Sequence, residues 1–176
     1  KIGLKKAGME VIDSLRIIFE QMPDGMSPYV NKVFKSLDKQ EKMLFEKSLD
    51  RFNKICLLAH EKNVRVLVDA EESWIQNAID EIVLSMMMKY NKEKAIVFNT
   101  SQMYRHDRLN YLKTLHDNAL KNNFFVGIKL VRGAYIEKEN KRARRNNYLS
   151  PICSSKELTD KNFNNGVSYI LSNLDR

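Results

Sequence analysis

Helical periodicity covers much of the chain. Apolar residues recur every three or four positions, which is typical of helices that turn one face to a core. The segments with this spacing are residues 6–22, 38–62, 73–90, 107–122 and 156–174. Asp38 followed by Glu41 also has the sequence of a capping box, so the second of these helices is expected to begin there.

Between the helices lie short apolar runs that are rich in β-branched residues and predict strands. They are residues 64–68, 95–98 and 124–131. Strands without polar alternation, each followed by a helix, are typical of a parallel sheet covered by helices. The polar segment that follows Gly133 is expected to be a loop.

A polar residue stands at the predicted end of each strand. These residues are Asp69, Asn99 and Lys129, and they are 30 residues apart in both intervals. A barrel places its chemistry at the carboxyl ends of all its strands, whereas a doubly wound sheet binds mostly at one switch point, so the regularity favours a barrel.

The predicted fold class is therefore α/β, a partial (βα)8 TIM-like barrel preceded by helices. Closing such a barrel takes about eight strands, and about three are present. Residues 38–176 are expected to form the central part of the barrel domain, and residues 1–37 an N-terminal helical segment. The chain is accordingly expected to be a piece of a longer protein.

Composition narrows the classes of protein that remain. Hydrophobic residues make up 43% and charged residues 30% of the 176 residues, which is ordinary for a globular protein. No stretch of about 18 apolar residues predicts a membrane span. The two cysteines exclude a disulfide framework. Residues 1–22 contain three acids and no continuous apolar core, so neither a signal nor a transit peptide is expected there.

The net charge of +8 is concentrated in one segment. Residues 129–145 contain seven basic and two acidic residues and so carry +5 of that charge. Such a local cluster suggests a local anion, such as a phosphate or a carboxylate, rather than a nucleic acid. No RNP-like motif or zinc-finger spacing accompanies it. No metal site is predicted, because the three histidines lack a common ligand spacing.

The strand-end residues allow chemistry, but the residues alone leave alternatives open. Asp69 is a possible anchor or proton acceptor beside a helix N-terminus. Asn99 could bind the edge of a heterocycle, or it could be a simple turn residue. Lys129 and Arg132 around Gly133 could hold an anionic group, or they could belong to a basic surface loop.

Three blocks together resemble the proline dehydrogenase family, also called proline oxidase, in its eukaryotic mitochondrial branch. They are Val68–Glu71, Phe98–Tyr104 and Lys129–Tyr135, in the family's order and at similar separations. The resemblance implies a distorted (βα)8 barrel that binds FAD. It also implies oxidation of L-proline to Δ1-pyrroline-5-carboxylate, with hydride passing to the flavin and electrons passing on to a quinone.

The resemblance also implies roles for individual positions. Asp69 matches the active-site aspartate, and Lys129 matches a basic residue near flavin N5. Asn99 matches a position that hydrogen-bonds the isoalloxazine, and Tyr135 matches an aromatic residue of the proline pocket. The remaining positions match the FAD-binding backbone and loop: Ala70, Val131, Arg132, Gly133 and Ala134.

The family further implies association with the inner-membrane surface and no nucleic-acid partner. A eukaryotic source would imply a mitochondrial location on the matrix side, and a bacterial source a cytoplasmic or membrane-associated one. A hydroxyproline dehydrogenase and a non-catalytic barrel that serves as a scaffold are the alternatives.

Some positions depart from the family pattern. Ser101 stands where the family often has Tyr. The family's barrel lysine has no match in residues 1–62, and its paired arginines are expected beyond Arg176. The 176 residues by themselves are therefore expected to be inactive and poorly folded, because parallel strands with unpaired edges close no core.

Overall fold

The computed structural model describes residues 38–175, which contain five helices and three strands. In chain order they are α3 (Lys39–Glu61), β1 (Val66–Leu67), α4 (Ser73–Tyr90), β2 (Val97–Gln102), α5 (Arg108–Asn122), β3 (Ile128–Val131), α6 (Ile136–Arg145) and α7 (Lys156–Leu171). The chain divides into two compact units, one up to Leu58 and the other from Ala59 onward. The helix expected over 6–22 lies outside the described residues.

The three strands form one parallel sheet in the order β1-β2-β3. Each strand pairs with the next strand along the chain, and the described residues contain no reversal of strand order. Consecutive parallel pairing through helical crossovers is the construction of a (βα)8 barrel.

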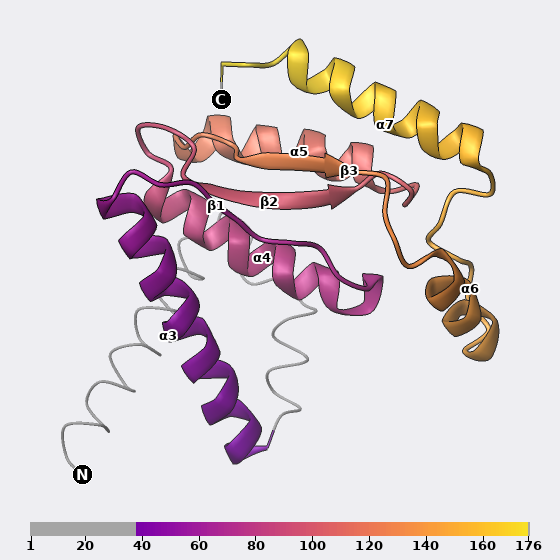
Figure 1. Ribbon diagram of the computed structural model, residues 1–176, viewed down its shortest axis with the longest axis horizontal. Helices are drawn as coiled ribbons and strands as arrows, with labels where there is room; N and C mark the ends of the chain where they lie inside the picture. Colours follow the sequence, from indigo (N-terminus) through magenta and orange to yellow (C-terminus); the bar gives the residue numbers. More distant parts are fainter. Residues whose placement is uncertain (1–37, 176) are drawn as a thin grey trace. The chain divides into compact units, whose positions relative to one another are not determined.

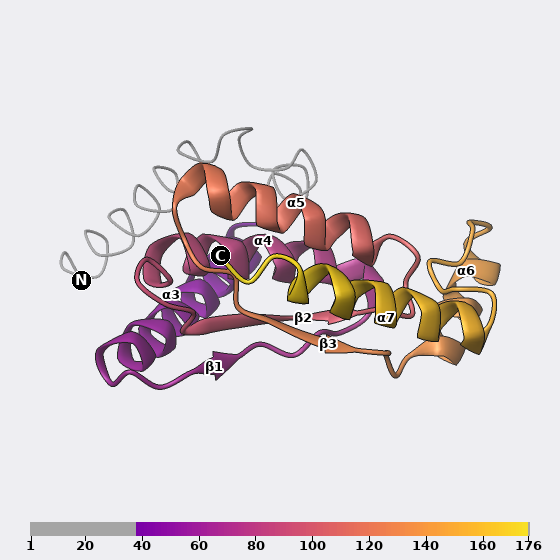
Figure 2. The same cartoon turned by 90° about the horizontal axis from the view of Figure 1, so that it is seen from above.

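Helices cover one face of this sheet. Contacts join α4 to β2, α7 to β3, and α5 to both α4 and α7. Figure 1 and Figure 2 show these helices running alongside the strands, with α6 lying beyond the carboxyl ends of β2 and β3. The core includes Val83 and Met86 of α4, Val97 of β2 and Leu112 of α5, all nearly inaccessible to solvent.

The predicted strand boundaries were partly wrong. β2 runs to Gln102 instead of ending at Phe98, so Asn99 is its third residue and not a terminal one. β3 begins at Ile128 and contains Lys129. An unbroken run of apolar residues indicates neither where a strand ends nor which of its side chains face the helices, because polar and apolar residues do not alternate in it.

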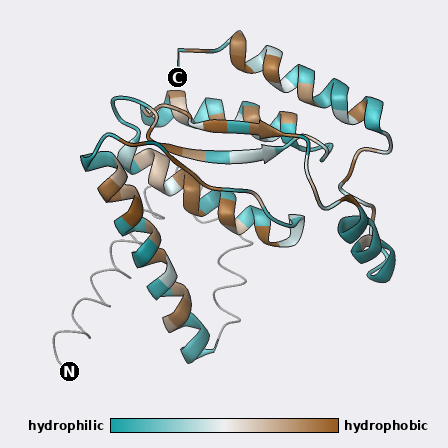
Figure 3. Cartoon of the chain, in the orientation of Figure 1, coloured by the Kyte–Doolittle hydropathy of each residue, from teal (hydrophilic) through white to brown (hydrophobic). Residues whose placement is uncertain are grey.

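The prediction of a loop after Gly133 was wrong over Ile136–Arg145, which form α6. Figure 3 shows this helix as almost entirely hydrophilic. Ile136 and Ala143 are its only apolar residues, so the periodicity that marks the other helices is missing. The capping box was confirmed: the backbone N–H of Asp38 donates to Glu41, and that of Glu41 donates to Asp38.

Candidate functional site

Asp69 lies two residues beyond β1 and forms an ion pair with Lys129, the second residue of β3. Thr100 on β2 pairs in register with Lys129. Residues that are paired in a parallel sheet share a face, so Lys129 and Thr100 turn to the face opposite the helices. Thr100 also donates through Oγ1 to the carbonyl oxygen of Val68 at 2.7 Å, which fixes β1 beside β2. Two of the residues predicted for the site thus lie together in the structure.

Two further contacts join the same two loops. The Tyr135 hydroxyl donates to Glu71 Oε2 at 2.8 Å. Lys138 of α6 forms an ion pair with Glu72, and its hydrogen bond lowers the pKa of that carboxyl. The hydrogen bond to Glu71 raises the pKa of Tyr135, because the neutral hydroxyl is its donor. The loop after β1 and the segment after β3 therefore form one polar surface.

Arg132 and Gly133 lie in the segment between β3 and α6. Arg132 Nε donates to Asp160 Oδ1 of α7 at 2.6 Å, and its guanidinium lies 4.4 Å from the centre of the Phe163 ring. Gly133 has a φ of +124°, and a Cβ there would lie 2.5 Å from the Tyr104 ring. The need for glycine therefore comes from this ring and from the backbone angle.

We expect Gly133→Ala to destabilise the protein by about 1–3 kcal/mol, the usual cost of a strained backbone position. Thermal unfolding of the complete protein measures the effect. Ala134→Gly, which adds no atom at the next residue, is the control. A melting temperature for Gly133→Ala equal to that of the wild type would contradict the steric argument.

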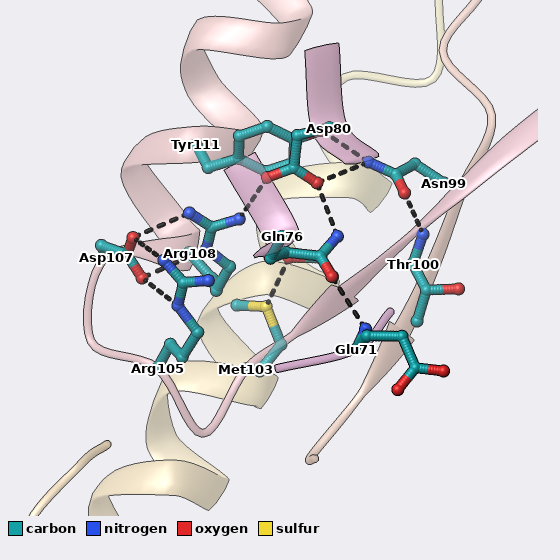
Figure 4. A network of polar contacts seen from close by, with 11 residues as sticks. Glu71, Gln76, Asp80, Asn99, Thr100, Met103, Arg105, Asp107, Arg108 and Tyr111 are labelled. Atoms are coloured by element: carbon teal, nitrogen blue, oxygen red, sulfur yellow. Dashed lines mark hydrogen bonds and ion pairs between the residues drawn. The ribbon is translucent and has the colours of Figure 1, made fainter. Parts of the chain in front are cut away.

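Asn99 is placed differently from the other predicted site residues. Its amide nitrogen donates to Asp80 of α4 and to the Tyr111 hydroxyl of α5, each at 2.8 Å. It is fully buried between the sheet and these helices, on the face of β2 opposite Thr100 (Figure 4). The structure therefore does not bring Asn99 together with Lys129, and contact between its side chain and a flavin stays a prediction.

The network around Asp80 reaches back to the loop after β1. Asp80 Oδ1 accepts from Gln76 at 2.8 Å, and Gln76 Oε1 accepts from the backbone N–H of Glu71 at 2.9 Å. Asp80 Oδ2 forms an ion pair with Arg108 at 2.8 Å, and both side chains are less than a tenth exposed. These contacts hold the loop after β1 from the side of the helices.

Asp107 extends the network at the start of α5. Both of its oxygens accept from Arg105 and from Arg108 at 2.7–3.1 Å. Burial alone would raise the pKa of Asp107, but the hydrogen bonds and charges of Arg108 and Arg105 outweigh it and lower the pKa to about 2. The carboxylate therefore stays ionised throughout the physiological range.

Sequence reasoning missed several residues that shape the site. Glu139 of α6 is fully buried, and its carboxylate accepts from the backbone N–H and the hydroxyl of Ser73, each at 2.6 Å. Gln102 ends β2 on the same face as Thr100, and its Oε1 has no hydrogen-bond partner among the described residues. Only strand alternation from Thr100 could have indicated Gln102. Nothing in the sequence pattern indicated Glu139.

The residues of this face fit the chemistry of a flavin. A flavin ring has donors and acceptors along one edge and gains negative charge when it is reduced. Lys129 supplies a cation at the strand ends, and Gln102 supplies a buried amide oxygen free to accept. Ala70, Val131 and Ala134 lie in or beside the same strand ends. Their predicted contacts with the cofactor stay predictions.

Residues 38–175 contain neither a metal site nor a membrane-spanning helix. No group of three histidine, cysteine, aspartate or glutamate residues there could hold a metal ion. No helix of this part of the chain is both long and apolar enough to cross a membrane.

Known proteins resemble this chain in sequence and in structure. The family model described as proline dehydrogenase matches residues 5–176. The chain is 34% identical over 169 residues to proline dehydrogenase 1, mitochondrial, of Drosophila melanogaster, covering 96% of this chain and 24% of that protein. It is 39% identical over 127 residues to the protein of the same name from Dictyostelium discoideum, covering 71% of this chain and 22% of that protein.

Among solved structures, proline utilization A from Bdellovibrio bacteriovorus, inactivated by N-propargylglycine, matches with a TM-score of 0.68 and 25% identity. The match covers 72% of this chain and 13% of that chain. It confirms the predicted fold class, a part of a TIM-like barrel. The chain spans only about a quarter of the length of the two curated relatives.

Proposed function

Because the chain belongs to the proline dehydrogenase family, we propose that it forms part of an FAD-dependent enzyme that oxidises L-proline to Δ1-pyrroline-5-carboxylate. The observation that carries the proposal is the ion pair between Lys129 of β3 and Asp69, which lies just past the carboxyl end of β1. Active sites of TIM-like barrels lie at that end.

The roles of the residues follow from their positions. When bound, FAD supplies the acceptor for the hydride that leaves a ring carbon of proline. The ammonium of Lys129 stabilises the negative charge that this transfer produces. Asp69 holds that ammonium in place through its ion pair.

Other residues bind rather than react. Tyr135, held by Glu71, lines the proline side of the site. Arg132, which Asp160 of α7 holds through an ion pair, begins the proposed cofactor-binding loop, and Gly133 and Ala134 continue it. Gln102 presents its buried oxygen as an acceptor to the flavin edge.

The cellular setting follows from the relatives. Both curated relatives are named mitochondrial, so we place the complete protein in mitochondria, at the matrix side of the inner membrane. There it would pass electrons to a quinone. The basic residues of 138–145 belong to helix α6, and we propose no nucleic-acid partner for them.

L-Proline is favoured over hydroxyproline because the relatives from Drosophila melanogaster and Dictyostelium discoideum, at 34% and 39% identity, are named proline dehydrogenases, whereas a hydroxyproline dehydrogenase of Xenopus laevis is 32% identical. A scaffold role is disfavoured because these relatives are named as dehydrogenases.

The decisive experiment is reduction of the flavin-loaded protein under anaerobic conditions. L-Proline should bleach the flavin absorbance, and hydroxyproline should do so with a lower kcat/KM. Proline-dependent reduction would exclude the scaffold alternative. A stoichiometric flavin that neither amino acid reduces would reject the proposed activity.

A further inference from the structure

Glu139 of α6 is a buried carboxylate that the proposed chemistry does not use. It is fully inaccessible to solvent, although α6 is otherwise almost entirely charged and exposed. A buried carboxylate is unfavourable unless it is paired or hydrogen-bonded. Its hydrogen-bond partners therefore indicate which part of the structure Glu139 stabilises.

Both described partners belong to one residue at the start of α4. The backbone N–H of Ser73 donates to one oxygen of Glu139 and the Ser73 hydroxyl to the other, each at 2.6 Å. The residue that precedes α4, Glu72, makes no capping hydrogen bond with its side chain. Glu139 thus caps α4 from a distant segment, and the positive end of the helix dipole stabilises its charge.

The contact joins the two segments that carry the ion pair. Ser73 lies four residues after Asp69, and Glu139 lies one helical turn after Tyr135. Neighbouring contacts reinforce the junction: the Arg142 guanidinium lies 4.3 Å from the centre of the Trp74 ring. A shift of Ser73 relative to Glu139 would therefore act on the two segments that hold Asp69 and Lys129.

We infer that Glu139 is a positioning residue, which sets the geometry of the Asp69–Lys129 pair by capping α4 from α6. The inference rests on the proposed function for its readouts on the flavin, and amide exchange in the protein is independent of it. The readouts on the flavin are its reduction rate and its midpoint potential.

Glu139→Ala removes both acceptors and leaves the Ser73 amide unpaired. A misplacement of about 1 Å can cost a rate factor of about 10². We therefore expect flavin reduction at saturating proline to slow by about 10- to 100-fold. The flavin potential should become more negative, because the displaced ammonium stabilises the reduced flavin less.

Three other variants isolate the effect. Glu139→Gln keeps an acceptor for the Ser73 amide and should retain most of the wild-type rate and potential. Ser73→Ala removes one of the two bonds and should shift the potential in the same direction by less. Glu137→Ala, an exposed carboxylate on the same helix, is the matched control and should change neither quantity.

Amide hydrogen exchange adds a readout that needs neither proline nor flavin. Exchange over residues 72–76 should accelerate in Glu139→Ala and stay unchanged in Glu137→Ala. If Glu139→Ala only lowers the melting temperature, with potential and reduction rate as in the wild type, the residue is merely structural and the inference is overturned.

If Glu139→Ala does not fold, the Ser73→Ala variant tests the inference in its place. An unchanged potential and an unchanged rate in that variant would also overturn the inference. A wild-type protein that binds flavin but is not reduced by proline would instead overturn the proposed function, and the potential and exchange measurements would still test Glu139.

Discussion

Lys129→Ala is expected to slow flavin reduction by proline by about 10²-fold, the cost of removing one group that stabilises charge in the transition state. Lys129 is the cation that the structure places on the open face of β3, paired with Asp69. The variant removes the positive charge that would balance the reduced flavin. Stopped-flow absorbance at saturating proline measures the rate of this step alone.

Binding and chemistry can be separated in the same variant. The apparent KM for proline should change less than the reduction rate, because the charge that Lys129 stabilises develops mainly in the transition state. Lys129→Arg keeps the cation and should retain more of the rate. Lys141→Ala, an exposed lysine of α6, is the charge-matched control. A reduction rate in Lys129→Ala equal to that of the control would reject the assigned role.

The proximity of Asp69 and Lys129 could be expected from the sequence because the signal for it is local. A helix, a strand and a polar strand-end residue recur every 30 residues, and that order led to the parallel sheet and its open end. Asp69 and Lys129 then meet because parallel strands in register bring equivalent positions to the same level of the sheet. No knowledge of distant contacts was needed.

Asn99 shows where local signals stop. The run before it, Ala95–Phe98, is apolar throughout, so it does not reveal which side chains face the helices. The side chain of Asn99 points toward the helices because it binds Asp80 and Tyr111, which are 19 and 12 residues away in the chain. A polar side chain can be buried only where such partners exist, and they become visible only when the helices are packed.

Glu139 was missed for a related reason. Its helix has almost no apolar residues, so the hydropathy pattern does not indicate which side of the helix is buried. The burial comes from the Ser73 donors on another helix. Long-range polar pairing of this kind leaves no periodic trace in the sequence.

The Asp80–Arg108 pair should dominate the stability of the sheet's helical layer. Arg108→Ala is expected to lower the free energy of unfolding by about 3–5 kcal/mol, because it leaves a buried carboxylate without its cation. Both side chains are less than a tenth exposed, so solvent screens the pair weakly. Gln76 and Asn99 would still donate to Asp80, but neither brings a compensating charge.

Denaturant unfolding of the flavin-loaded protein measures this loss, with Lys113→Ala as the control, since that lysine is exposed on the same helix. The double variant Asp80→Ala, Arg108→Ala should be destabilised by less than the two single variants added together, because the second substitution removes the charge that the first left unpaired. Additive losses would show that the two residues stabilise the protein independently. In that case the link from α5 through Asp80 and Gln76 to the Glu71 backbone would not act as one network.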